Sequence, residues 1–181
     1  MKRVLQFGVA ALALTQITGQ AAVGSMIVQN NNGGTIIPIF DVDGTTKLAG
    51  ANYSIGVYVV NPDGSVISQV GGFVSPGANF RFTGGTQDVG IAGGTVQLSV
   101  HAWDTRTGAT YATAVNKAAS PVFTSPVLGG DADNDPSTPA GVPLSMALNF
   151  KSFKLETVPE PSTMALAALG LGGLIFISRR K

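Results

Sequence analysis

An uncharged apolar segment lies at each end of this chain, and each segment adjoins a cluster of basic residues. The acidic residues, by contrast, all lie between Asp41 and Glu160. Apolar runs bounded by basic residues are typical of targeting signals and membrane anchors rather than of domain interiors. The folded domain therefore has to be built from the sequence between the two segments. The basic residues at the two ends are Lys2, Arg3, Arg179, Arg180 and Lys181.

The N-terminal segment has the three parts of a secretory signal peptide. A positively charged start precedes an apolar run over 4–14, which only Gln6 interrupts. Small residues follow, and signal peptidases cut after small residues, so cleavage is predicted after Ala21 or Gly24. We assign residues 1–24 to a signal peptide, which predicts that the mature chain is exported.

The C-terminal segment has a proline-containing motif, an apolar stretch and a basic end. Pro159-Glu160-Pro161 comes first, and Arg179, Arg180 and Lys181 close the chain. The stretch between them has no polar face, which argues against a half-buried helix of the domain and predicts a short transmembrane helix at about 163–178. The basic stop would lie on the cytoplasmic side of the membrane.

These parts, in this order, resemble a PEP-CTERM protein-sorting domain over residues 158–181. In such tails an exosortase, which is an integral-membrane processing enzyme, recognises the motif that Pro159, Glu160 and Pro161 match here. The resemblance implies a protein of a Gram-negative bacterium that makes extracellular polysaccharide. It also implies a transient anchor in the inner membrane, followed by delivery to the cell surface or the extracellular space.

The central segment, residues 25–157, predicts a single all-β domain. Residues 53–60 are rich in β-branched and aromatic side chains, and the turn sequence Asn61-Pro62-Asp63-Gly64 separates them from a second apolar run at 65–70. This pattern is typical of a β-hairpin. Apolar and polar residues alternate over 95–103, as in a half-buried antiparallel strand. Further strands are predicted at 35–40, 79–83, 122–128 and 144–155.

One short helix is predicted at 110–119, where Tyr111, Ala114, Val115 and Ala118 recur on one face. About six to nine short strands separated by turns are typical of a β-sandwich, of either the immunoglobulin-like or the jelly-roll type. The order of the strands does not follow from the sequence.

The central segment also resembles a recurring ectodomain of secreted PEP-CTERM proteins. A strand that ends in Ala102-Trp103-Asp104 precedes the turn Gly108-Ala109-Thr110-Tyr111, and Phe73 and the Phe-Arg-Phe run at 80–82 belong to the same pattern. This resemblance implies an architecture and a location, but no reaction.

The residue composition excludes several classes of catalytic site. The chain has no cysteine and one histidine, His101, which excludes thiolate metal sites and sites with two imidazoles. It has no Gly-x-Ser-x-Gly motif, and its only glutamates, Glu156 and Glu160, lie beside the tail. His101 and Trp103 are predicted on one strand face and Asp104 on the other, which argues against a catalytic triad. We predict no enzymatic activity, no catalytic residues and no cofactor.

One acidic loop leaves calcium binding open. Asp131, Asp133 and Asp135 alternate, as the first ligands of an EF-hand loop do. Pro136 then stands where that loop needs glycine, and Val142 stands where it needs a bidentate glutamate. We therefore assign no metal site, and a solvated acidic loop is the alternative.

The sequence Asp41-Val42-Asp43-Gly44-Thr45 resembles the nucleophile motif of haloacid-dehalogenase phosphatases. That motif follows a parallel strand in an α/β fold, which needs alternating helices that this sequence lacks. We predict a hairpin turn with Asp-Gly at its centre.

The mature domain is predicted to be mildly acidic. If the tail is removed after Glu160, six basic residues remain against 10 acidic ones, a net charge of −4. No basic stripe is left for nucleic acid. We predict an exported surface or matrix protein with a non-enzymatic structural or binding role. A carbohydrate-binding module that retains extracellular polysaccharide through Tyr58, Trp103 or Tyr111 is one alternative, and a secreted hydrolase is another.

Overall fold

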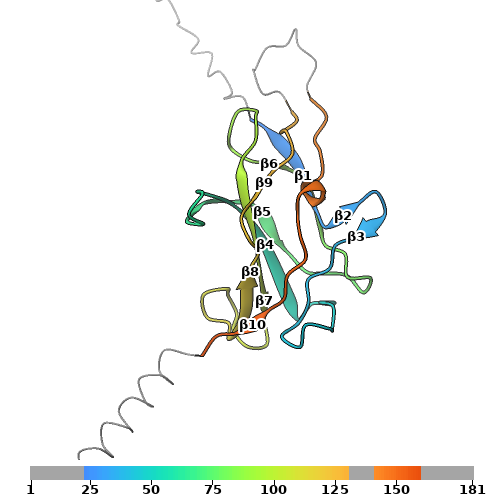
Figure 1. Cartoon of the computed structure of the whole chain (residues 1–181), viewed down its shortest axis with the longest axis vertical. Coiled ribbons are helices and arrows are strands. Elements are labelled where there is room, and N and C mark those ends of the chain that lie inside the picture. Colours follow the sequence, from blue (N-terminus) through green and yellow to red (C-terminus); the bar gives the residue numbers. More distant parts are fainter. Residues whose placement is uncertain (1–22, 131–140, 160–181) are drawn as a thin grey trace, which may run out of the picture.

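The structure, a computed structural model, describes residues 23–130 and 141–159 (Figure 1). Most of the predicted signal peptide, the Asp131–Asp135 loop and the tail from Glu160 onward lie outside the described residues. No helix in the described part of the chain is long and apolar enough to cross a membrane.

The described chain forms β-strands and one 3-10 helix. The largest sheet has six antiparallel strands in the order β10-β8-β7-β4-β5, with β9 paired to β7 as well. A second sheet pairs β1 with β6, and β2 and β3 form a small hairpin. The all-β prediction is confirmed, and the sheets are open. The elements are β1 Ser25–Gln29, β2 Asn31–Asn32, β3 Thr35–Ile36, β4 Tyr53–Val60, β5 Val66–Val74, β6 Thr83–Asp88, β7 Gln97–Asp104, β8 Asn116–Ala119, β9 Phe123–Thr124, the 3-10 helix η1 Met146–Leu148 and β10 Glu156–Thr157.

The predicted hairpin over 53–70 and the predicted strand over 95–103 are both confirmed. They appear as β4, β5 and β7, which are adjacent in the large sheet. Alternate residues of β4 and β7 point into the core, and all of them are buried. The residues that β4 and β7 contribute to the core are Tyr53, Ile55, Val57, Val59, Leu98, Val100 and Ala102.

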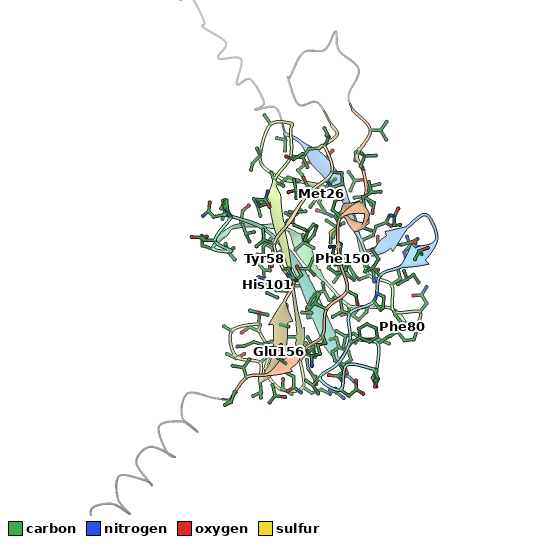
Figure 2. The ribbon with its side chains drawn as sticks, in the orientation of Figure 1. Met26, Tyr58, Phe80, His101, Phe150 and Glu156 are labelled. Carbon is green, nitrogen blue, oxygen red and sulfur yellow. The ribbon has the colours of Figure 1, made fainter. Side chains whose placement is uncertain are left out.

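The second sheet and the C-terminal segment complete this core. Met26 and Val28 of β1 belong to the same buried cluster as the central strands. Met146, Phe150 and Leu155 join it from the other end of the chain (Figure 2). One face of the large sheet is therefore covered by segments far apart in the sequence. In Figure 1, β1 starts at the upper end of the molecule and β10 lies at the lower end.

The helix predicted at 110–119 is wrong. Residues 110–113 form a turn, in which the Ala114 amide donates to the Thr110 carbonyl at 2.9 Å, and β8 follows. This one turn accounts for the helix-like spacing of Tyr111 and Ala114. Pairing with β7, which places Lys117 opposite Trp103, then draws the chain into the sheet. Tertiary pairing here overrides a local preference.

Two predicted strands are wrong, and two are shorter than predicted. The segment 79–83 is a turn in which Phe80 has φ 64°, and β6 begins only at Thr83. The segment 144–155 contains η1, which Ser145 caps through its side chain, instead of a strand. The strands predicted at 35–40 and 122–128 are reduced to β3 and β9.

Candidate functional site

The face of the large sheet that points away from the core carries a row of five aromatic rings. Residues of β7 alternate between the two faces, which places His101 and Trp103 opposite the core residues of that strand. Tyr58 comes from β4, and Tyr111 comes from the turn before β8. We call these residues the aromatic face; its members are Tyr58, Phe73, His101, Trp103 and Tyr111.

The rings of the aromatic face contact one another in sequence. The His101 ring lies with its centroid 4.4 Å from that of Tyr58, and Figure 2 labels both residues. Its centroid lies 4.5 Å from that of Tyr111. Trp103 lies edge-on to Phe73, with centroids 5.1 Å apart. Burial lowers the pKa of His101 and raises that of Tyr111, so both rings are neutral at pH 7. The row can offer ring faces to a ligand, but it carries no charge of its own.

Trp103 does not provide an exposed platform. Its side chain is only 2% exposed, whereas Phe73 beside it is 57% exposed. The Trp103 Nε1 group is buried and has no hydrogen-bond partner among the described residues. The ring surface that solvent reaches belongs to Phe73 and, in part, to Tyr58, His101 and Tyr111.

A groove of about 510 Å³ adjoins the aromatic face at the edge of the sheet. Tyr111 belongs to both features, and the Lys117 ammonium lies 5.5 Å from the centroid of its ring. Glu156 and Val158 line the groove on the side of β10. The groove therefore combines two aromatic rings, Tyr111 and Phe153, with two lysines and one carboxylate; the charged residues are Lys117, Lys154 and Glu156.

Asp104 belongs to a structural network on the opposite face of β7 from His101. Both of its carboxylate oxygens accept hydrogen bonds from the Arg106 guanidinium, each at 2.8 Å. Arg106 also donates to the hydroxyl of Tyr53, which in turn donates to Asp41 at 2.6 Å. The Arg106 hydrogen bonds lower the pKa of Asp104. This geometry is incompatible with a triad of His101 and Asp104.

The segment Asp41–Thr46 is a tight turn, as predicted. Phe40 and Lys47 form an antiparallel bridge, and the Asp41 amide donates to the Thr46 carbonyl at 2.7 Å. The Asp43 carboxylate accepts from the amides of Thr45 and Thr46 and from the Thr46 hydroxyl, and these bonds lower its pKa to about 2. The phosphatase motif does not fit this setting: its nucleophile would be Asp41, which starts a turn in an all-β domain and accepts hydrogen bonds from the Val42 amide and the Tyr53 hydroxyl. Within residues 23–130 and 141–159, no three His, Asp or Glu side chains are grouped to hold a metal.

The last strand leads directly into the predicted sorting signal. In β10, Glu156 pairs with Lys117, and Thr157 pairs with Asn116. The next residue, Val158, donates its amide to the Val115 carbonyl at 2.8 Å. Of the predicted signal residues, the structure places Pro159, which is exposed; Glu160, Pro161 and the basic stop of Arg179, Arg180 and Lys181 lie outside the described residues.

Comparison with known families decides what this end of the chain is. A family model described as a PEP-CTERM protein-sorting motif matches residues 157–181. The tail is a PEP-CTERM sorting motif. Neither a curated protein nor a solved structure matches the chain.

The PEP-CTERM motif confirms the resemblance drawn from the sequence. Such motifs are the C-terminal tails of exosortase substrates, which makes an exosortase the processing partner and indicates export to the cell surface or the extracellular space. The match begins at Thr157, inside β10, so the motif starts within the folded domain. The boundary predicted from the sequence lies one residue later, at Val158, and the sequence pattern does not predict β10. The aromatic face was predicted only in part, because the inclusion of Phe73 depends on the pairing of β5 with β4.

Proposed function

We propose that this protein is an exported component of the cell surface or extracellular matrix with a non-enzymatic structural or binding role. The observation that carries the proposal is the match of residues 157–181 to the PEP-CTERM motif, directly after a folded all-β domain. In this proposal the two sheets are the layers of a β-sandwich, and the tail is a processing signal and temporary membrane anchor.

The hydrogen bonding of the acidic residues supports a structural role. Asp41, Asp43 and Asp104 each accept a hydrogen bond from a nearby backbone amide. Each also accepts one from a side chain, so each carboxylate holds a turn or joins two segments. An exported domain is usually stabilised by disulfides, and this chain has no cysteine to form them. These hydrogen bonds and the apolar core stabilise the domain instead.

The sorting proposal is tested by the intact mass of the protein isolated from a host with its exosortase. We expect a mature species that lacks the apolar stretch and Lys181. In the same host, Glu160→Ala should accumulate with Lys181 retained. Asp88→Ala, which removes an exposed carboxylate of β6, should be processed like the parent. A parent protein that still ends in Lys181 would contradict the proposal.

A second candidate function is the binding of carbohydrate at the aromatic face. The specific observation in its favour is that the partly exposed ring of Tyr111 lines a groove together with Lys117. The partly exposed ring of Tyr58 continues the aromatic face from there through His101. Aromatic faces bind ligands with apolar ring surfaces, and groove polar groups orient them. On a glycan array, Tyr111→Ala should lose binding that the control Ile67→Ala keeps. If the mature parent protein binds no glycan on the array, this candidate function is contradicted.

A further inference from the structure

We propose that β10 is a releasable clip that controls access of the exosortase to the PEP-CTERM motif. In this view, the strand separates from β8 as far back as Leu155 before the motif is processed. The inference rests on the proposed sorting function. It adds one step to that function, which is the separation of β10 from β8 before processing.

The motif is held close to the folded domain while β10 is paired. Val158 is bound through its amide to Val115, so Glu160 lies only two residues beyond a fixed point. Two extended residues span about 7 Å. A membrane enzyme would have to bring its catalytic groups to within this distance of the sheet edge, where the domain itself is in the way. An exosortase active site that binds the backbone of this segment in extended form would also compete with β8 for the same backbone groups. The segment therefore cannot enter that active site while it is paired.

The contacts that hold β10 are few and exposed. The strand has two residues, both exposed, and Val158 is 43% exposed. A single side-chain hydrogen bond supports the pairing, from the Thr157 hydroxyl to Asn116 at 3.2 Å. Lys117 stands opposite Glu156, but its ammonium donates to the Ala112 carbonyl at 2.8 Å instead of forming an ion pair. Segments with little buried apolar surface and exposed backbone bonds open most readily.

The residue before the clip is held much more firmly. Leu155 is fully buried in the core, and its amide donates to the Phe40 carbonyl at 2.9 Å. Phe40 in turn donates to the Phe153 carbonyl at 2.9 Å. Separation of the strand therefore stops at Leu155. From Leu155 to Glu160 the released chain spans about 17 Å, more than twice its reach when β10 is paired.

A disulfide across the clip tests this mechanism. The double variant Asn116→Cys and Thr157→Cys joins two residues that face each other in the ladder, at a separation that a disulfide accepts. The chain has no other cysteine, so the cross-link is unique. Processing in an exosortase-containing membrane fraction, followed by intact mass, should slow about tenfold or more in the oxidised protein, because cleavage follows the open population. A thiol reductant should restore the parent rate in the same protein.

Two controls separate release of the clip from other effects. The cross-link Gln97→Cys and Thr124→Cys joins β7 to β9 at the other end of β7 from β8 and β10, and it should leave processing unchanged. A flexible Gly-Ser spacer of about five residues between Val158 and Pro159 should restore processing of the oxidised Asn116–Thr157 variant. If the cross-link slowed processing by misfolding the protein, the spacer would not restore it. A cross-linked protein that is processed at the parent rate overturns the clip alone. A parent that is never processed overturns the sorting proposal and the clip together.

Discussion

Asn30 is the buried polar residue on which the chain path around β1 depends. It is fully buried, and its side chain donates to the carbonyls of Ile37 and Phe80, each at 2.9 Å. Its side-chain oxygen accepts from the Phe82 amide, also at 2.9 Å. One side chain thus satisfies three backbone groups, which belong to the segment around Ile37 and to the segment 80–82. These segments form no ladder with each other, so Asn30 connects them and fixes the turn in which Phe80 adopts a positive φ.

Replacement of this residue should be costly. Asn30→Ala leaves three backbone groups without partners, the buried Phe82 amide and the part-buried carbonyls of Ile37 and Phe80. We therefore expect the free energy of unfolding in urea to fall by about 3 kcal/mol. The control is Asn149→Ala, which removes an exposed bond to the Thr124 carbonyl and should cost less than about 1 kcal/mol. Equal losses of unfolding free energy in the two variants would show that the three bonds of Asn30 contribute no more than one exposed bond.

Tyr53 should make the stability of the fold sensitive to high pH. Burial and the hydrogen bond to Asp41 raise the pKa of its hydroxyl from 10.0 to about 12. The folded protein therefore binds this proton more tightly than the unfolded chain does. The stabilisation is complete below about pH 10 and is lost as the pH rises toward 12.

The measurement is phenolate absorbance together with urea unfolding across this pH range. We expect the last ionising tyrosine of the parent to titrate near pH 12 and to be missing from Tyr53→Phe. The stability of that variant should fall less between pH 10 and 12 than that of the parent. A late phenolate that persists in Tyr53→Phe would assign the raised pKa to Tyr58 or Tyr111, whose pKa values burial also raises.

Among the elements, the strands with a strong local pattern could be predicted from the sequence, and those that depend on distant pairing could not. The alternation in 95–103 predicted β7 and the face on which His101 and Trp103 lie. The sequence of β6, Thr83–Asp88, has no apolar residue and two glycines, so only its ladder with β1 makes it a strand. The same holds for β10, which has two exposed residues and becomes a strand through β8.

The turn before β8 depends on a glycine. A Cβ at Gly108 would clash with the backbone of Thr113 and Ala114, which cannot move without moving β8. Gly108→Ala should therefore lower the free energy of unfolding by about 2 kcal/mol or more. Gly72→Ala adds the same methyl group in β5, where nothing lies within 4 Å, and should change it by less than about 0.5 kcal/mol. Thermal or urea unfolding of both variants checks the difference, and a neutral Gly108→Ala would contradict this account of the turn.

At the scale of the whole molecule, the two faces of the large sheet are covered in different ways. One face is buried by β1, η1 and the C-terminal segment, which meet in a single core. The other face is covered by its own side chains, and Trp103 is shielded there by Phe73 and Tyr111. The only tryptophan of the chain therefore reports on the aromatic face and not on the main core.

This arrangement predicts that removal of one exposed ring will uncover the tryptophan. In Phe73→Ala, Trp103 loses the ring that contacts it at 5.1 Å, so its fluorescence should shift to longer wavelength and become more accessible to acrylamide. Ile67→Ala is the matched control, because Ile67 lies on the same strand and is also 57% exposed, but it makes no ring contact with Trp103. It should leave the emission unchanged. If Phe73→Ala also leaves the emission unchanged, Phe73 does not shield Trp103 in solution, and the aromatic face is more open to ligands than its packed rings indicate.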